Sequence, residues 1–399
     1  MPDRRPHLLT VSGQDGPGLA ERVFAALADK EVDVRDVEQV RVHGHLLLCV
    51  EVGLALAEVG PVEVDLARAL ADCPVEIALA ALVEQEMAPA ADQHLITVLA
   101  SEIDAATLQR VTGCIRECGG NIERIVRLSA YPVHSYELAV AGGALGHLRM
   151  SLAEEAVRCQ VDIAVQPAGL HRRAKHLIVL DADSTLLQGE VIDLLAAQHG
   201  CAGEVAAVTE AAMEGQMDFE EALRRRVRLL AGLDRTGLDA VRCGIVLTPG
   251  ARTLVRTLKR LGYELAVVSG GFTQVISGVV AELGIDHLAA NVLAIEGGRL
   301  TGELEGPIID RAGKAAALVR FAQAAGVPLS HTIAVGDGAN DLDMLAAAGL
   351  GIAFNAKPVV RQAADTALSV PYLDAILFLL GISRGDVELA DQVDPVGVR

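Results

Sequence analysis

The strongest constraint on the fold is a short apolar run that ends abruptly in acidic residues. Its sequence is Leu177-Ile-Val-Leu-Asp181-Ala-Asp183-Ser-Thr185. Four apolar residues followed by a sharp change in polarity are typical of a buried parallel strand. Open α/β sheets bind their ligands just beyond the carboxyl ends of such strands. The run predicts an α/β fold with Asp181 and Asp183 at the ligand-binding edge, although a strand end with an Asx turn explains the run alone equally well.

Two later apolar runs also end abruptly in glycines and polar residues. Residues 264–268 lead into Ser269-Gly270-Gly271, whose hydroxyl and backbone N–H groups can bind a phosphate. Residues 332–335 lead into Gly336-Asp337-Gly338-Ala-Asn340-Asp341, in which both carboxylates can face one cation. The run at Ser269 alone is more simply a glycine-rich turn. Together with Asp181 the two runs predict a shared site, and the oxygen ligands favour Mg²⁺.

Two basic residues fall on helix faces that are otherwise apolar. Arg226 shares its face of the predicted helix 219–230 with apolar side chains, while the other arginines of that helix face away. Lys314 lies on the apolar face of the predicted helix 313–325. A buried cation is costly unless it meets a carboxylate or a phosphate. Each side chain is therefore a candidate ligand-binding group, the alternative being that it snorkels at the edge of its face.

These residues suit phosphoryl transfer to a carboxylate. Asp181 would attack phosphorus and form an aspartyl phosphate. Magnesium, Lys314, Ser269 and backbone N–H groups would neutralise the charge on the phosphoryl oxygens. Asp183 would protonate the leaving alkoxide and later deprotonate the water that hydrolyses the intermediate.

The N-terminal 170 residues contain a duplication. His7-Leu-Leu-Thr-Val11 is nearly repeated as His94-Leu-Ile-Thr-Val98, and apolar positions downstream follow the same register. Each copy reads strand, helix, strand, strand, helix, strand, with its first helix at about 18–30 or 106–118. This is the ferredoxin-like βαββαβ order.

The two copies, at 1–86 and 92–168, resemble ACT domains, modules that bind amino acids and pair their sheets side by side. The resemblance implies an amino-acid effector, with serine as a candidate, and a homodimer. Its best local mark is Asp15-Gly-Pro-Gly18, where glycines let the backbone approach a ligand at a helix N-terminus. An ordinary strand-to-helix turn explains the same residues. The second copy has Ser101-Glu-Ile-Asp-Ala105 there, without glycine.

Composition excludes several other classes. The chain of 399 residues has 34 Lys and Arg against 53 Asp and Glu, a net charge of −19, with 3% aromatic residues and no Trp. Acidity and the lack of aromatic stacking groups argue against nucleic-acid binding. No apolar stretch approaches the ~20 residues that span a membrane. Seven scattered cysteines without a framework predict reduced thiols and a cytoplasmic protein.

Residues 173–385 resemble the haloacid dehalogenase superfamily and, within it, the phosphoserine phosphatases. The motifs that carry this resemblance are the runs after Asp181, Ser269 and Gly336, together with Lys314 and the segment from Met213 to Arg226. It implies a Rossmann-like parallel-sheet core at 172–388 with a small helical cap at about 187–250. A linker at 167–176 would precede the core, and a disordered tail at 389–399 would follow it.

The resemblance also implies residue roles. Glu190 would receive the substrate ammonium and Arg226 its carboxylate, with Met213 and Phe219 closing the cap. The side chains of Asp181 and Asp337 and the carbonyl of Asp183 would bind magnesium, supported by Asp341. The remaining phosphate-binding residues would be Ser269, Gly270, Lys314 and Asn340.

The implied reaction is the hydrolysis of O-phospho-L-serine to L-serine and phosphate, the last step of serine synthesis. A phosphotransferase or a phosphoprotein phosphatase with the same chemistry is the alternative. A non-enzymatic amino-acid sensor is less consistent with the sequence, because Asp181, Asp183, Lys314 and Asp337 are all present.

Overall fold

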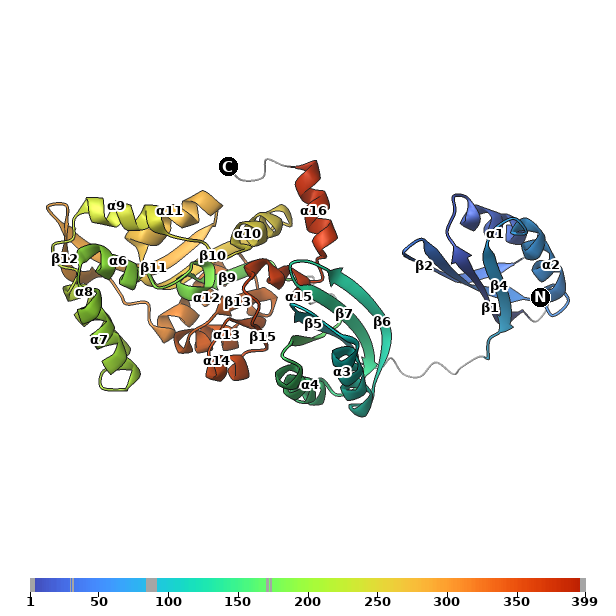
Figure 1. Cartoon of the computed structure of the whole chain (residues 1–399), viewed down its shortest axis with the longest axis horizontal. Coiled ribbons are helices and arrows are strands. Elements are labelled where there is room, and N and C mark those ends of the chain that lie inside the picture. The colour runs from blue at the N-terminus through green and yellow to red at the C-terminus, as the bar shows by residue number, and fades with distance from the viewer. Residues whose placement is uncertain are drawn as a thin grey trace. The chain divides into compact units, whose positions relative to one another are not determined.

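Three β-sheets organise the chain, and they are distributed over two structural units (Figure 1). The computed structural model describes residues 4–394 apart from 29, 31, 84–91, 170, 171 and 173. Residues 1–90 form one unit and residues 91–399 the other. In the described residues, no helix is both long enough and apolar enough to cross a membrane.

The first unit is a four-stranded antiparallel sheet with two helices. In chain order its elements are β1 (Arg5–Gln14), α1 (Leu19–Ala28), β2 (Asp33–Val42), β3 (His45–Leu54), α2 (Val59–Ala69) and β4 (Val75–Ala81). The strand order is β2-β3-β1-β4, so β1 lies between β3 and β4. Leu9 and Val11 on β1 pack against Leu19, Val23 and Leu27 of α1 in a separate core.

The second copy repeats this order at the start of the second unit. Its elements are β5 (Gln93–Ala100), α3 (Ala105–Glu117), β6 (Gly120–Ser129), β7 (His134–Gly142), α4 (Leu145–Cys159) and β8 (Asp162–Pro167). The strand order β6-β7-β5-β8 is equivalent to that of the first copy. Both predicted ferredoxin-like modules are therefore confirmed.

A seven-stranded sheet forms the rest of the second unit, in the order β12-β11-β10-β9-β13-β14-β15. Its strands are β9 (Leu177–Asp181), β10 (Glu264–Phe272), β11 (His287–Glu296), β12 (Arg299–Glu305), β13 (Thr332–Gly336), β14 (Leu350–Phe354) and β15 (Thr366–Leu368). All neighbours pair in parallel except β11 and β12. On β9, Ile178 and Leu180 belong to one buried cluster, and Leu177 and Val179 to another. Helices cover both faces of the sheet, which is why the run is apolar throughout.

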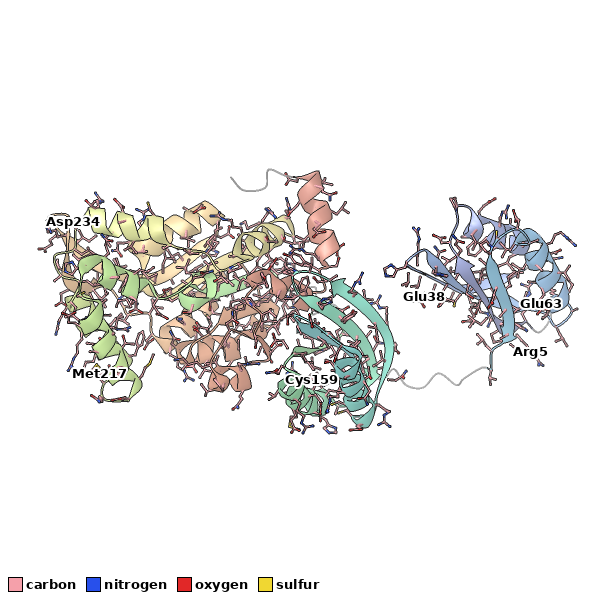
Figure 2. All side chains as sticks on the ribbon, viewed as in Figure 1. Arg5, Glu38, Glu63, Cys159, Met217 and Asp234 are labelled. Atoms are coloured by element: carbon pink, nitrogen blue, oxygen red, sulfur yellow. The ribbon has the colours of Figure 1, made fainter. Side chains whose placement is uncertain are left out.

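Helices connect these strands in the manner of a Rossmann-like fold. The longer ones are α10 (Ala251–Arg260), α11 (Thr273–Leu283) and α12 (Arg311–Ala324), followed by the short α13 (Leu342–Ala347), α14 (Pro358–Ala363) and α15 (Ile376–Leu379). Four more lie between β9 and α10: α6 (Val191–His199), α7 (Ala202–Met213), α8 (Phe219–Arg228) and α9 (Arg235–Gly244). Met217 marks the loop between α7 and α8 (Figure 2). The predicted parallel-sheet core is confirmed.

The C-terminal segment differs from the prediction. Residues 389–393, expected to be disordered, belong to the helix α16 (Arg384–Val393), while 395–399 lie outside the described residues. Ser383 caps this helix by accepting a hydrogen bond from the Asp386 backbone N–H at 3.1 Å. Asp391 then forms ion pairs with Arg256 and Arg260 of α10. The cap and these charged side chains explain an ordered helix in a polar sequence.

The predicted linker also differs from an exposed connection. Arg172 is only 8% exposed, and its Nη1 lies 2.6 Å from the Glu137 carboxylate on β7. Its Nε donates to the carbonyl of Leu379 at the end of α15. Lys175 is buried as well and donates to the carbonyl of Ser330. Arg172 thus connects the second copy to the seven-stranded sheet domain, and Lys175 binds the segment after it to the same domain.

Candidate active site

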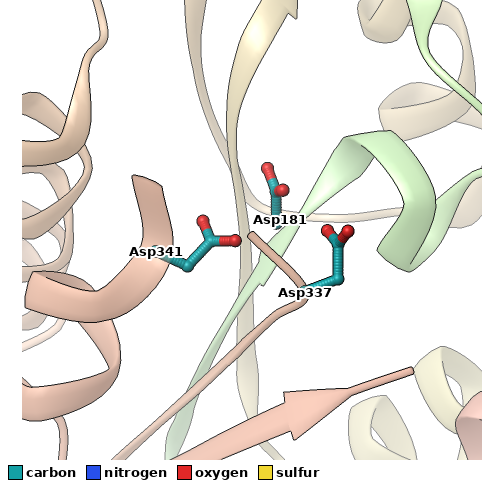
Figure 3. Close-up of side chains that lie close together, drawn as sticks. All are labelled: Asp181, Asp337 and Asp341. Carbon is teal, nitrogen blue, oxygen red and sulfur yellow. The ribbon is translucent and has the colours of Figure 1, made fainter. Parts of the chain in front are cut away.

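Three aspartates converge at the carboxyl end of the seven-stranded sheet (Figure 3). Asp181 ends β9, Asp337 follows β13, and Asp341 closes the 3-10 turn η3 (Ala339–Asp341). One carboxylate oxygen from each lies within 4.8 Å of the others. Strands β9 and β13 are parallel neighbours, so their ends present side chains to the same space.

Lys314 joins two of these carboxylates. Its Nζ lies 2.7 Å from Asp181 and 2.6 Å from Asp341, and its side chain is 1% exposed. Burial would lower the pKa of Lys314, but the two negative charges outweigh it and raise the pKa above its usual value. Lys314 lies in the first turn of α12, where the helix dipole disfavours a cation. The ion pairs compensate for that position.

Asp183 is held by a second set of donors. Its Oδ1 accepts from the backbone N–H of Val191 at 2.8 Å, and its Oδ2 accepts from the Ser269 hydroxyl at 3.1 Å. The backbone N–H of Gly271 donates to the Ser269 Oγ at 2.7 Å. A Cβ at Gly271 would lie 2.9 Å from Asp183 Oδ2, so only glycine fits there. Ser269 therefore fixes both the glycine loop and Asp183.

The turn after β9 sets the direction of the two carboxylates. Residues 182–186 (η1) form a tight turn, closed by the Leu187 N–H donating to the Ala182 carbonyl at 2.8 Å. Ser184 has a φ of 56°, in the left-handed region. This turn returns Asp183 toward Ser269 while Asp181 stays beside Lys314.

Burial makes the acidic groups hold protons more tightly. It raises the pKa of Asp181 well above the ordinary value, opposed by Lys314 and reinforced by Asp341 and Asp183. Burial raises the pKa of Asp183, and burial together with Asp341 raises that of Asp337 to about 6. Closely spaced carboxylates in a low-dielectric site gain from a bound cation, which would reverse these shifts. The oxygen-only donor set therefore fits a divalent metal ion.

The charges of Glu190 and Arg226 influence each other at the rim of the site. Glu190 precedes α6, and loss of water around its carboxyl group, together with Asp183 and Asp337, raises its pKa to about 7. Burial lowers the pKa of Arg226, offset by Glu190, Asp193 and Asp183. Among the described residues Arg226 forms no ion pair, and its Nε only donates to the Ala222 carbonyl at 3.4 Å.

The other arginines of α8 behave as surface residues. Arg224 pairs with Glu220 at 2.8 Å and Arg225 with Glu221 at 2.6 Å, both one turn away on the same helix. Among the described arginines of α8, Arg226 is therefore the one whose guanidinium interacts with the acidic groups of the site.

The two apolar residues expected to close the cap lie differently. The Phe219 ring comes within 3.7 Å of where a Cβ of Gly270 would stand, so α8 reaches the glycine loop. Met213 is 72% exposed and lines a cavity of about 540 Å³ between α6 and α7, together with Asp193, Thr209 and Glu210. Only Phe219 therefore touches the core side of the site.

Asn340 lies over the turn that follows β13. Its Oδ1 would be 2.2 Å from a Cβ at Gly338, so a larger residue at that position would displace the Asn340 side chain. Asp341 receives the Gly338 N–H on Oδ2 at 2.9 Å and Lys314 on Oδ1. Both of its oxygens are thus engaged by protein donors.

Two supporting residues were missed by sequence reasoning. Asn291 on β11 is 1% exposed, donates to the Gly270 carbonyl at 2.8 Å and accepts from the Ile309 N–H at 2.8 Å. Thr185 donates to Asp337 Oδ1 at 3.4 Å. A lone Asn in an apolar strand gives no local signal of the loop it supports. Thr185 lay within the first motif, but its partner is 152 residues away.

Comparisons with known proteins agree with this architecture. Residues 178–346 match the haloacid dehalogenase-like hydrolase family, and residues 6–79 and 92–166 each match an ACT domain family. A phosphoserine phosphatase from Streptomyces coelicolor is 53% identical, over 96% of this chain and 94% of its own. The phosphoserine phosphatase SerB2 of Mycobacterium tuberculosis is 48% identical, over 100% and 98%.

Solved structures show the same folds. A haloacid dehalogenase family hydrolase from Salmonella enterica serovar Typhi superposes with a TM-score of 0.64 at 29% identity, over 72% of this chain and 98% of that one. A probable phosphoserine phosphatase from Vibrio cholerae gives a TM-score of 0.58 at 32% identity, over 75% and 88%. With its site geometry and full-length relatives, this chain belongs to the phosphoserine phosphatase family of haloacid dehalogenase-like hydrolases, with two N-terminal ACT domains.

Proposed function

We propose that this protein is a Mg²⁺-dependent phosphatase that hydrolyses O-phospho-L-serine to L-serine and phosphate, with Asp181 as nucleophile. One observation carries the proposal. The buried carboxylate of Asp181 lies at a strand end beside the cation Lys314. A second carboxylate, that of Asp183, follows Asp181 by two residues and accepts a hydrogen bond from the Ser269 hydroxyl. An attacking group, a positive charge for the phosphoryl oxygens and a proton carrier are thus within one site.

The first half-reaction transfers the phosphoryl group to the protein. An Asp181 oxygen bonds to phosphorus as the bond from phosphorus to the serine oxygen breaks. The leaving alkoxide takes a proton from Asp183, whose pKa is raised by burial, so that the acid form is accessible. Lys314, the Ser269 hydroxyl and the neighbouring backbone N–H groups stabilise the negative charge on the phosphoryl oxygens.

The second half-reaction regenerates the nucleophile. Water attacks the phosphorus of the aspartyl phosphate, Asp183 accepts its proton, and the bond from phosphorus to Asp181 breaks to release phosphate. Without Asp183 the first step would stall at departure of the serine alkoxide. The Ser269 hydroxyl keeps Asp183 directed toward the reacting oxygen.

A magnesium ion would be held by the side chains of Asp181 and Asp337 and by the Asp183 carbonyl. When bound, it supplies positive charge that neutralises the phosphoryl oxygens. Asp341 acts as support for the site, because Lys314 and the Gly338 N–H already occupy its two oxygens. Thr185 similarly orients Asp337.

The head group of the substrate would bind at the rim. Glu190 would receive the ammonium, which also favours the ionised form of a carboxyl group whose pKa is otherwise raised to about 7. Arg226, free of an ion pair among the described residues, would bind the carboxylate bidentately. Phe219 already covers the Gly270 loop, and Met213 would move onto the bound substrate when the cap closes. Asn340 would lie near the phosphate.

The first ACT domain would bind an amino-acid effector, with serine as the candidate. A cavity of about 360 Å³ lies beside the Asp15–Gly18 loop and is also lined by Arg22 and Asp72. The exposed valines of β2, including Val40 and Val42, support a homodimer in which sheets pair at this edge. All seven cysteines are free thiols, which supports a cytoplasmic location.

The test is phosphate release from phosphoserine, phosphothreonine, a phosphoserine peptide and a sugar phosphate, with and without Mg²⁺. We expect phosphoserine to be the best substrate and chelation of the metal to abolish turnover. A peptide hydrolysed as fast as the free amino acid would favour the phosphoprotein phosphatase alternative. Phosphate appearing on an added alcohol instead of in solution would favour a phosphotransferase.

A substitution tests the head-group assignment in the same assay. Arg226→Ala should raise KM for phosphoserine by about 30-fold or more, the size expected when one partner of a desolvated charge pair is removed. It should change KM little for a phosphate ester without a carboxylate. The control is Arg225→Ala, which breaks only the surface pair with Glu221. Equal losses on both substrates would contradict the role of Arg226.

A further inference from the structure

We propose that Asp193 determines specificity at the head-group end of the site, as a fixed negative charge that selects phosphate esters carrying an ammonium group. Esters carrying only further anionic groups would be disfavoured by the same charge. The inference rests on the proposed function, since it concerns the group that the enzyme recognises beyond the phosphate. It adds a third residue to the pair of Glu190 and Arg226.

The position of Asp193 follows from the start of α6. Glu190 is the residue that precedes the helix, and the Asp193 backbone N–H donates to the Glu190 carbonyl at 3.2 Å. Residues three apart at a helix start lie on the same side, so both carboxylates face one region. Asp193 is exposed and lines the cavity that Met213 also lines. It therefore borders the space that a cap residue would cover.

The charge of Asp193 acts on the groups that would bind the head group. It contributes to the raised pKa of Glu190, and it opposes the effect of burial on the pKa of Arg226. Asp193 itself forms no ion pair with any residue that the structure describes. Its charge is thus not cancelled by a local partner and extends into the site.

A count of charges gives the expected selectivity. Among the described residues, the charges that act on one another around the head-group space are one guanidinium, that of Arg226, and the carboxylates of Asp183, Glu190, Asp193 and Asp337. A substrate with both an ammonium and a carboxylate supplies one charge of each sign to this set. A substrate with a carboxylate alone meets an excess of negative charge, so its binding is penalised.

The competing explanation is local. Acidic residues in the first turn of a helix stabilise it through the helix dipole, and Asp193 occupies such a position. If that were its only role, replacing it would change stability without changing the preference between substrates. The ratio of activities on two oppositely charged substrates separates the two explanations.

The experiment uses the full-length chain with Mg²⁺ and compares kcat/KM for phosphoethanolamine, which has an ammonium and no carboxylate, with that for phospholactate, which has the reverse. Asp193→Asn should lower the value for phosphoethanolamine and raise that for phospholactate, each about threefold to tenfold, as expected for one charge across partly solvated space. Asp193→Glu, which retains the charge, should keep the wild-type ratio.

The matched control is Glu210→Gln, which removes a carboxylate that lines the same cavity from α7 and not from the start of α6. Its ratio should equal that of the wild type. A ratio that changes less than about twofold in Asp193→Asn, or equally in Glu210→Gln, overturns the inference. Asp193→Ser gives the same readout if the Asn variant does not fold. Failure of the wild type to hydrolyse phosphoserine would instead refute the proposed function.

Discussion

The two ACT domains have the same strand order, yet they are built into the molecule in opposite ways. The first has its own hydrophobic core and forms a unit by itself. The second contributes Leu99, Leu128, Val133 and Ala164 to the large core of the seven-stranded sheet domain. One copy is therefore a separate module, and the other is part of the catalytic unit.

Equivalent positions in the two sheets show how this difference arises. Ser12 on β1 and Leu99 on β5 both follow the repeated His-Leu-x-Thr-Val run, and Leu99 is fully buried while Ser12 is partly exposed. Ala78 and Ala164 lie opposite the repeated threonines. Ala164 is 1% exposed, whereas Ala78 is exposed. The same sheet face is thus an interior surface in one copy and a free surface in the other.

The loops before the first helix differ in a complementary way. In the second copy the Asp104 side chain accepts from the Thr107 N–H at 2.8 Å and caps α3 itself. In the first copy that place is taken by Asp15-Gly-Pro-Gly18 beside a cavity. A helix end satisfied by its own side chain has less need of a ligand. The second copy is therefore attached to the catalytic domain, and the first copy carries the loop at which we propose that an effector binds.

The largest expected effect concerns the attachment. Arg172→Ala would leave Glu137 buried without its partner and remove donors to the carbonyls of Phe378 and Leu379. We expect a loss of about 3–5 kcal/mol in the stability of the second unit. Urea unfolding of the full chain, followed by loss of phosphatase activity, measures it.

The matched change in the first copy is Arg22→Ala. The pair of Arg22 with Asp72 is exposed, with 41% and 72% of the side chains accessible, so its loss should cost less than about 1 kcal/mol. Equal effects of the two substitutions would contradict the distinction between an attached and a separate copy.

A smaller effect is expected at the ligand loop. Serine at about 100 times its dissociation constant should stabilise the first unit by about 2.7 kcal/mol. Gly16→Phe should abolish that stabilisation by placing a ring in the cavity that Gly16 lines, because a Cβ there would meet no atom within 4 Å and the backbone φ is outside the left-handed region. Isothermal titration with serine and thermal unfolding report both quantities.

The control for this prediction lies in the second copy. Glu102→Phe alters the corresponding loop, which has no glycine and is closed by its own Asp104 cap. It should leave the serine response unchanged. If the serine response were lost in Glu102→Phe and retained in Gly16→Phe, the second copy and not the first would be the one that binds serine.

Much of the fold and the site could be predicted because the signals are local. The apolar run before Asp181 identified a central strand, and the two further strand ends identified its neighbours. The apolar helix faces identified Arg226 and Lys314, and the latter is 1% exposed between two carboxylates. A basic residue on an otherwise apolar helix face interrupts the helical pattern of apolar positions, so it can be recognised from the sequence alone.

The remaining features depend on partners far along the chain. Arg172 reads as part of a polar linker, but its partner Leu379 is 207 residues away. The sequence of α16 resembles a polar tail. The helix is held by Arg256 and Arg260, which lie 135 and 131 residues before their partner Asp391, so its own sequence gives no sign of these contacts. Asn291 supports the Gly270 loop from the neighbouring strand β11. Such positions become visible only when the tertiary contacts are known.

The central claim is that Asp181 attacks the phosphoryl group, and phosphate release by Asp181→Asn tests it most directly. The variant keeps the size of the side chain at the end of β9 but lacks the nucleophilic carboxylate. We predict that turnover of phosphoserine falls by roughly 10⁴-fold or more while the thermal unfolding profile stays close to that of the wild type. Phosphate release within about tenfold of the wild type, from a correctly folded variant, would contradict the account.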